Sequence, residues 1–234
     1  MLIFINRYYA PDSSATSQLL CDLAVNLVGA GQDVTVISSR QLYGDPLANL
    51  QTSEIIDGVS VSRVWSFSFG RNRLLGRALD YLSFYVSTFI RLMLIAQPGD
   101  TVIAKTDPPL VSAVAGIAAK LKKLTLINWI QDLFPEIAVA LGVPGVGFVA
   151  PALIKMRDYS LKQARMNIVI GERMRTVLIR RGIGEHQVRA IPNWAVGDFG
   201  KVSDVDVARL RQSWVGEAKF VIGYSGNFGR AHNF

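Results

Sequence analysis

Apolar runs long enough for single strands alternate along the chain with segments of helical spacing. In the first helical segment Leu19, Leu23 and Leu27 recur every four positions, and the glycines at 29 and 31 end it. The pattern predicts helices at about 19–28, 72–97, 110–122, 148–164 and 172–181. It predicts strands at 2–6, 33–39, 59–65, 101–105, 124–130, 167–171 and 188–192.

This alternation of strands and helices predicts an α/β fold with a doubly wound, Rossmann-like parallel sheet. Most of the predicted strands are rich in Val and Ile without polar alternation, which is typical of strands buried on both faces. We expect residues 1–195 to form this domain. Residues 196–217 are more polar and are predicted to be a linker. The apolar run and glycine turn at 218–234 are predicted to start a second domain.

Polar residues follow several of the predicted strands. Asp12, Asp107, Asp132 and Asn193 each come after an apolar run. Doubly wound sheets bind ligands outside the carboxyl ends of their strands, so we expect these four residues to share one edge of the sheet.

The loop after the first predicted strand contains Pro11, Asp12, Ser13 and Ser14 and lacks the G-x-G-x-x-G dinucleotide pattern. Ser or Asp there can cap the next helix by accepting hydrogen bonds from free backbone N–H groups. The same helix N-terminus can also hold an anion, and the sequence leaves both interpretations open.

Composition narrows the class of protein. The chain has 234 residues, half of them hydrophobic, and a formal net charge of +7, which favours an anionic partner. It has one cysteine and two histidines, so an internal disulfide is impossible and a metal site built on Cys and His is not expected. The sequence shows no signal peptide, and a cytoplasmic location is expected.

A basic and aromatic segment lies between Arg63 and Arg91, and it contains one acid, Asp80. It can be a core helix with a solvated basic start, or an amphipathic helix resting on anionic lipid. Nucleic-acid binding is disfavoured because the basic residues border an apolar segment. Asp80 and Arg91 also argue against a membrane-spanning helix. The residues expected to dock on the membrane are Arg71, Arg73 and Arg77, with the aromatic residues Tyr81, Phe84, Tyr85 and Phe89.

The linker contains Asp204-x-Asp206, which is similar to the D-x-D motif that holds a metal in some sugar transferases. Ser203 and Asp206 have the spacing of a capping box, and this interpretation is preferred.

Five motifs occur in an order that resembles glycosyltransferase family 4. They are "YYAPDSSATS", "TDPPL", "QDLFPE", "IPNW" and "YSGNFGRAH". The chain is most similar to the branch that acts in bacterial colanic acid, capsule and O-antigen synthesis. That branch carries a D-L-F/W-P-E motif after a central strand and an N-W-A turn after the last strand of its first domain.

The resemblance implies a GT-B architecture, in which two Rossmann-like domains hold the substrates between them. It implies a retaining, metal-independent transfer that needs no cofactor, from a nucleotide sugar to a lipid-linked (polyprenyl diphosphate) saccharide. The enzyme would lie in the cytoplasm, peripheral to the inner face of the plasma membrane. On this basis Asp132 is the expected catalytic residue. The residues expected on the acceptor side are Asp12, Ser13, Ser14, Asp107, Gln131 and Glu136, and those expected on the donor side are Asn193, Gly226, Asn227 and Arg230.

The chain departs from the family pattern at several positions. Ser13 and Ser14 stand where many members have paired glycines, Gln131 stands where many have histidine, and Asn227 stands at the expected Arg of the donor loop. The glutamate-rich donor motif would lie beyond Phe234, so we expect this chain to be the acceptor half and inactive alone. The alternative is a non-catalytic nucleotide- or glycan-binding Rossmann-like domain. An oxidoreductase or epimerase is disfavoured because the glycine fingerprint is missing.

Overall fold

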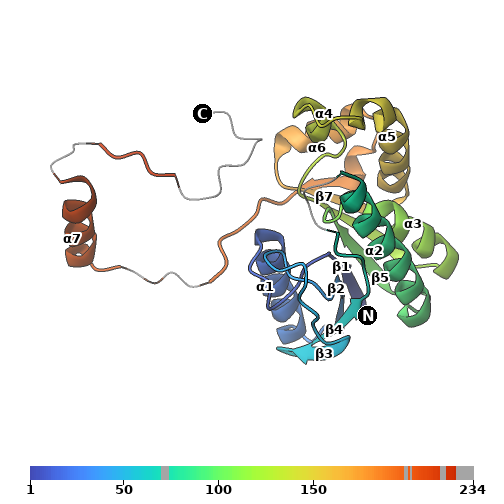
Figure 1. The fold of residues 1–234 in the computed structure, drawn as a ribbon, viewed down its shortest axis with the longest axis horizontal. Helices are drawn as coiled ribbons and strands as arrows, with labels where there is room; N and C mark the ends of the chain where they lie inside the picture. The colour runs from blue at the N-terminus through green and yellow to red at the C-terminus, as the bar shows by residue number, and fades with distance from the viewer. Residues whose placement is uncertain (70–73, 198–199, 201, 217–219, 225–234) are drawn as a thin grey trace. The chain divides into compact units, whose positions relative to one another are not determined.

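A computed structural model describes residues 1–69, 74–197, 200, 202–216 and 220–224 of the chain (Figure 1). The contacts divide the chain into two units, Met1–Trp194 and Ala195–Phe234, and each is described separately.

In the described part of the first unit the strands form one eight-stranded sheet. Its order is β3-β4-β2-β1-β5-β6-β7-β8, and every neighbouring pair is parallel except β3 with β4. The α/β Rossmann-like fold class is therefore confirmed. The strands are β1 Leu2–Ile5, β2 Val34–Ser39, β3 Ser53–Ile56, β4 Val59–Val64, β5 Thr101–Lys105, β6 Thr125–Ile130, β7 Met166–Val169 and β8 Val188–Ala190.

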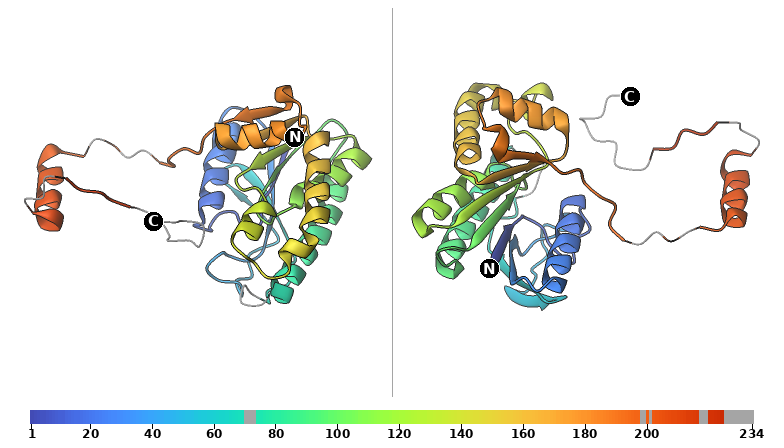
Figure 2. Two further views of the ribbon diagram at one scale, coloured as in Figure 1. Left: turned by 90° about the horizontal axis from the view of Figure 1, so that it is seen from above. Right: turned by 180° about the vertical axis from the view of Figure 1, so that it is seen from behind.

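Helices cover both faces of this sheet. Helices α2, α3 and α5 pack side by side on one face, and α1 lies on the other (Figures 1 and 2). The helices are α1 Ala15–Gly29, α2 Leu74–Ile95, α3 Val111–Lys122, α4 Glu136–Ala140, α5 Val146–Gln163 and α6 Glu172–Arg180, followed by a 3₁₀ turn at Glu185–Gln187.

The sequence pattern missed strand β3 and the short helix α4. β3 is an edge strand with alternating burial, and it forms an antiparallel hairpin with β4 through Asp57 and Gly58. Both turn residues have positive φ, 48° and 81°, which is the conformation that makes Asp-Gly a hairpin signal. A Cβ on Gly58 would also lie 2.8 Å from Cγ1 of Val28, so the close approach of α1 reinforces the need for glycine.

The main core lies between the centre of the sheet and the layer of α2 and α3. Ile3 and Ile5 of β1 meet Phe84 of α2, and all three are fully buried. The partly buried Tyr85 and Phe89 pack against the same core. The expectation that the aromatic residues of this helix contact a membrane is therefore wrong for Phe84, because its side chain is fully buried in the core.

The length and composition of α2 would let a helix cross a membrane over Leu75–Ile95, where the mean hydropathy is 1.4. Core helices of soluble proteins share these properties. One side of α2 packs into the interior of the first unit, where the side chains of Phe84, Thr88 and Leu92 are each 0% exposed. One side of α2 is therefore part of the domain core, and 28% of its most apolar window is buried in this structure.

In the second unit, helix α7 spans Asp204–Val215. Oγ of Ser203 accepts a hydrogen bond from the backbone N–H of Asp206 at 3.1 Å and donates to Oδ2 of the same residue at 2.7 Å. The prediction that Ser203 caps this helix is therefore confirmed. Residues 220–224, in the apolar run predicted to start a second domain, form no strand. An apolar run needs a neighbouring strand to complete its hydrogen bonds, which the sequence pattern cannot show.

Candidate active site

The polar residues singled out in the sequence follow the carboxyl ends of parallel strands. Asp12 follows β1, Asp107 follows β5, Asp132 follows β6 and Asn193 follows β8. These strands run parallel, so the four residues come after the same edge of the sheet, as expected. β1 lies between β2 and β5, and this reversal of winding direction is where doubly wound sheets commonly bind ligands.

Asp12 is engaged by the protein itself. Its side chain is buried, with 8% exposed, and Oδ1 accepts a hydrogen bond from the backbone N–H of Ser14 at 2.8 Å. Oδ2 accepts a hydrogen bond from the backbone N–H of Tyr43. Asp12 therefore joins the loop after β1 to the loop after β2, and its role toward an acceptor stays a prediction.

The N-terminus of α1 has no side-chain cap from its N-cap residue. Ser14 occupies the N-cap position, but its hydroxyl makes no capping hydrogen bond. The Oγ atoms of Ser14 and Ser17 are buried without a hydrogen-bond partner among the described residues. Ser13 is exposed. The arrangement leaves hydroxyl groups beside a helix N-terminus, which is a suitable environment for an anion.

A buried cation lies at the end of β5. Lys105 is fully buried, and its Nζ donates a hydrogen bond to the carbonyl of Thr16 at 2.9 Å. Nζ also lies 3.8 Å from the ring centroid of Trp129. Burial lowers the pKa of Lys105 to about 7, and the nearby charge of Asp107 opposes that change. Because its pKa lies near neutral pH, Lys105 could change its charge when an anionic ligand binds at this edge of the sheet.

Trp129 also connects the sheet to the end of the first unit. Its ring stacks on Trp194, with centroids 5.9 Å apart and an interplanar angle of 11°. Nε1 of Trp194 donates a hydrogen bond to Oδ2 of Asp22 at 2.6 Å. The sequence indicated Asn193 but missed this group of Lys105, Trp129, Trp194 and Asp22. The only local signal was a lysine at the end of an apolar strand.

Gln131 and Asn193 meet at the carboxyl edge. The side-chain amide of Asn193 donates a hydrogen bond to Oε1 of Gln131 at 2.8 Å. The backbone N–H of Gln131 donates to Oγ1 of Thr106 at 3.2 Å. Nε2 of Gln131 is buried and has no hydrogen-bond partner in the described part of the chain. Residues expected on the acceptor and donor sides are thus in direct contact.

Asp132 lines a cavity of about 210 Å³ beside this pair. The residue itself is exposed, yet the protein atoms around its carboxyl group remove enough water to raise the pKa of Asp132 above its usual value. No described residue forms a hydrogen bond or ion pair with that carboxylate. The other lining residues are Thr106, Pro109, Leu110, Ser112, Ile130, Phe134, Ile137, Arg157 and Leu161. A carboxylate in this position could accept a hydrogen bond from a ligand hydroxyl or stabilise a nearby positive charge.

Glu136 forms ion pairs with two arginines. Its Oε2 lies 2.5 Å from Nη1 of Arg157, and its Oε1 lies 2.5 Å from Nη2 of Arg181. Arg157 is buried and also pairs with Asp158 at 2.7 Å. These contacts connect α4, α5 and the end of α6. Both oxygens of Glu136 serve this framework, and the expected acceptor contact stays a prediction.

Several residues expected in sites lie outside the described residues. They are the donor-side Gly226, Asn227 and Arg230 and the membrane-side Arg71 and Arg73. Arg77 is described and is half-buried in α2. Among the described residues, no three or more His, Cys, Asp or Glu side chains are grouped as potential metal ligands.

Known proteins are similar to this chain in sequence profile and in fold. Residues 16–194 match the profile of a family described as glycosyl transferase 4-like domain. The structure is similar to Anabaena Alr3699/HepE in complex with UDP, with a TM-score of 0.55 and 14% identity, over 91% of this chain and 49% of that chain.

The complex of the same Anabaena protein with UDP and glucose gives a TM-score of 0.54 and 16% identity, over the same two fractions, 91% and 49%. Sucrose-phosphate synthase from Thermosynechococcus elongatus gives a TM-score of 0.53 and 12% identity, over 82% of this chain and 47% of that chain. The chain thus spans about half the length of these structures, and at these identities the likeness concerns the fold. A search of curated protein sequences finds no match.

Proposed function

This chain belongs to the glycosyl transferase 4-like family, and from that premise we propose that it is the acceptor-side half of a retaining glycosyltransferase. The complete protein would transfer a sugar from a nucleotide sugar to a lipid-linked saccharide. The resemblance to the colanic acid, capsule and O-antigen branch supports a place in bacterial surface polysaccharide synthesis. The same resemblance supports a metal-independent reaction.

The observation that carries this proposal is the availability of Asp132. Its carboxylate stands at a cavity on the carboxyl edge of the sheet, where the described protein supplies no partner for it. A sugar hydroxyl can donate a hydrogen bond to such a group, and the surrounding protein atoms withdraw water from the carboxylate, which raises the pKa of Asp132. A ligand that provides a hydrogen-bond donor or a developing positive charge would therefore be favoured.

A nucleotide-sugar donor is supported by the two structures of Anabaena Alr3699/HepE, which contain UDP and, in one of them, glucose as well. We propose that Asn193, Gly226, Asn227 and Arg230 contribute to the donor side. Asn193 donates a hydrogen bond to Gln131, the residue directly before Asp132, so a donor bound near Asn193 would lie close to Asp132. Catalysis by proximity requires both substrates to be held in this way.

The location follows from the proposed acceptor. A polyprenyl diphosphate saccharide is anchored in a bilayer, so the enzyme would work in the cytoplasm at the inner face of the plasma membrane. The net charge of +7 supports contact with an anionic surface.

A transfer assay in the complete protein tests the proposal. Uridine-diphosphate hexoses and N-acetylaminosugars would be offered with polyprenyl diphosphate saccharides, and the anomeric configuration of the product would be determined by NMR. Asp132→Asn should lower turnover by roughly a hundredfold or more if the carboxylate acts at the reacting groups. The 234-residue chain alone should transfer no sugar.

Asp33→Asn is the matched control, because Asp33 is an exposed acid directly before β2, at the opposite edge of the sheet. It should leave turnover unchanged. Full turnover by Asp132→Asn would remove Asp132 from the mechanism. An inverted product would contradict the retaining mechanism. Failure to transfer any sugar would favour the alternative of a non-catalytic binding domain.

A further inference from the structure

Helix α2 exposes a continuous apolar stripe. Six large aliphatic residues recur every three or four positions, and each is between 46% and 81% exposed. This spacing places them on one side of the helix. The stripe consists of Leu75, Leu79, Leu82, Val86, Ile90 and Leu94. Exposure of apolar side chains to water is unfavourable. A long exposed row of them therefore indicates a surface that contacts an apolar partner.

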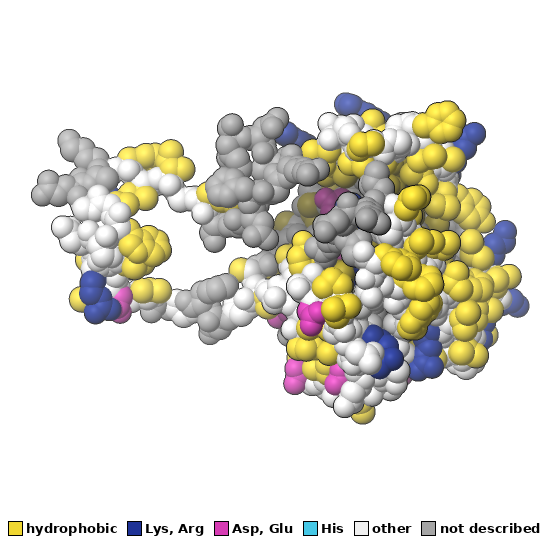
Figure 3. All heavy atoms as spheres, in the orientation of Figure 1, with side chains coloured by type: hydrophobic (Ala, Val, Ile, Leu, Met, Phe, Trp, Pro, Cys, Tyr) yellow, Lys and Arg dark blue, Asp and Glu magenta, His cyan; other side chains and the backbone are white. Residues whose placement is uncertain are grey.

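The apolar surface continues onto helix α3, which packs against α2. Ile117 and Leu121 of α3 are 49% and 62% exposed. Figure 3 shows hydrophobic side chains gathered over the region of α2.

Three aromatic rings extend the surface on a loop before α2. Trp65, Phe67 and Phe69 are 55%, 40% and 60% exposed. Their rings contact each other in sequence, with centroids 4.6 Å apart for the first pair and 5.0 Å for the second.

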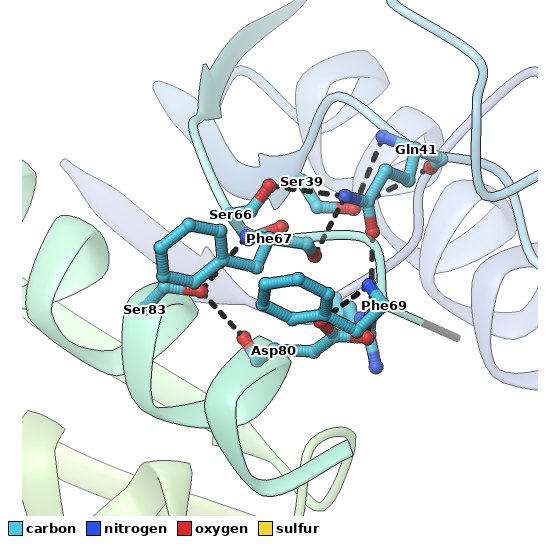
Figure 4. A network of polar contacts seen from close by, with 8 residues as sticks. Ser39, Gln41, Ser66, Phe67, Phe69, Asp80 and Ser83 are labelled. Atoms are coloured by element: carbon cyan, nitrogen blue, oxygen red, sulfur yellow. Dashed lines mark hydrogen bonds and ion pairs between the residues drawn. The ribbon is translucent and has the colours of Figure 1, made fainter. Parts of the chain in front are cut away.

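Buried polar contacts hold this loop against α2 (Figure 4). The backbone N–H groups of Phe67 and Phe69 donate to Oγ of Ser83 and Oδ1 of Asp80, each at 2.9 Å. Nε2 of Gln41 donates to the carbonyls of Ser66 and Phe67 at 3.1 and 2.9 Å. The exposed rings are therefore fixed to the structure by their backbone.

The exposed charged residues at the end of α3 are basic. The sequence of α3 contains no acid, and its C-terminal end carries the exposed Lys120 and Lys123. The one acid of α2, Asp80, is 2% exposed and forms an ion pair with Arg7. An apolar surface with lysines nearby and no exposed acid on α2 or α3 complements a layer of anionic lipid headgroups.

We propose that the apolar face docks on an anionic lipid bilayer, where the apolar face means the α2 stripe with Ile117, Leu121, Trp65, Phe67 and Phe69. The helix would lie along the membrane plane, because Phe84, Thr88 and Leu92 on its other side are fully buried in the first unit. Lys120 and Lys123 would contact lipid headgroups. The choice of lipid as the partner rests on the proposed lipid-linked acceptor.

This inference differs from the sequence expectation in its source of affinity. The sequence predicted docking through Arg71, Arg73 and Arg77 together with the aromatic residues of the helix, with an electrostatic attraction that salt weakens. The apolar face predicts binding that high salt weakens only in part, because apolar burial does not depend on screening.

Co-sedimentation of the chain with vesicles tests the apolar face. The vesicles would contain phosphatidylglycerol with phosphatidylcholine, or phosphatidylcholine alone, at low and high salt. The double variant Leu82→Gln, Ile90→Gln should lower partitioning by roughly tenfold or more, since it removes two exposed apolar side chains from the stripe. The control variant Ile55→Gln, Val177→Gln changes residues of β3 and α6 that are 75% and 38% exposed, and it should bind as the parent does.

Equal losses in both double variants, or no vesicle binding by the parent, would overturn the proposal. The proposal would also be overturned if the parent forms a dimer, does not bind vesicles, and becomes monomeric in the Leu82→Gln, Ile90→Gln variant. The apolar face would then join two copies of the chain. Resistance of the bound parent to alkaline extraction would indicate a spanning helix instead. Lys120→Ser, Lys123→Ser should weaken only the binding to anionic vesicles, by roughly fivefold per lysine. Equal weakening on neutral vesicles would remove the headgroup contact.

A second measurement needs no change to the stripe. Lipids brominated in the acyl chain quench tryptophans that enter the bilayer. Trp65→Phe should lose most of this quenching, whereas Trp214→Phe should retain it, although Trp214 in α7 is 77% exposed. Quenching that is unaffected by Trp65→Phe would contradict insertion of the aromatic loop. Vesicle binding is measured without donor or acceptor, so a chain that docks but supports no transfer would retain this inference and fail the proposed function.

Discussion

The loops after β1 and β6 each present an aspartate at the carboxyl edge of the sheet, but only one of them leaves its carboxylate available. Both oxygens of Asp12 accept backbone hydrogen bonds, from Ser14 and Tyr43. Asp132 lines an open cavity without a partner among the described residues. An acid after a strand can therefore hold loops together or wait for a ligand, and the local sequence is similar in both cases.

Glu136, four residues after Asp132, extends the comparison. It forms ion pairs with Arg157 and Arg181, so its role, like that of Asp12, is to hold the structure together. If this division is correct, changes at Glu136 and Asp12 should mainly affect stability, and changes at Asp132 should mainly affect ligand binding and turnover.

The largest expected effect on stability comes from Glu136→Gln. It should lower the free energy of unfolding by about 2 kcal/mol, because a buried arginine loses one of its two anionic partners and the Glu136 side chain is only partly exposed. Urea denaturation of the chain would measure this loss. Asp132→Asn, assayed in parallel, should change stability little, and an equal loss in that variant would break the division.

Asp12→Ala should have the next largest effect, lowering the free energy of unfolding by about 1.5 kcal/mol. Two backbone N–H groups would lose their acceptor, and one of them comes from a distant loop. Ser13→Ala is the control, because that side chain is exposed and makes no described hydrogen bond. If Asp12→Ala unfolds at the same urea concentration as Ser13→Ala, Asp12 does not hold the two loops together.

The smallest effect should appear in the pH dependence of stability. The raised pKa of Asp132 means that the folded chain binds its proton more tightly than the unfolded chain does. Stability contributed by this group is therefore greatest below the ordinary pKa of aspartate and falls as the pH rises toward the raised value. Asp132→Asn should remove that decline from a series of urea titrations. A parent curve that rises over the same interval and is unchanged in the variant would contradict the shift.

The sequence predicted the parallel strands because their apolar runs are continuous, as in 101–105 and 124–130. It could not predict which side of α2 faces inward, because that helix is apolar on both sides and periodicity then gives no direction. It missed β3, whose burial alternates at the edge of the sheet. The Asp57-Gly58 pair, which is a typical hairpin turn, would have indicated the hairpin of β3 and β4.

The candidate site was predicted in its position but not in its contacts. Because each follows the end of a predicted strand, Asp12, Asp132 and Asn193 were correctly expected at one edge of the sheet. Which carboxylate stays available depends on partners far away in sequence, such as Tyr43 for Asp12. Lys105 meets Trp129 only because β5 and β6 pair in register, Lys105 opposite Trp129. Such pairings depend on tertiary structure and are absent from local patterns.

The stacked indole rings of Trp129 and Trp194 should make the intrinsic fluorescence of the protein sensitive to changes at the candidate active site. Trp129 is 4% exposed, with Trp194 stacked 5.9 Å from its ring and the ammonium group of Lys105 nearby. Its emission should therefore respond to any event that moves Trp194 or neutralises Lys105. Because Trp129 stands two residues before Gln131, ligand arrival at the carboxyl edge could be followed by intrinsic fluorescence without adding a dye.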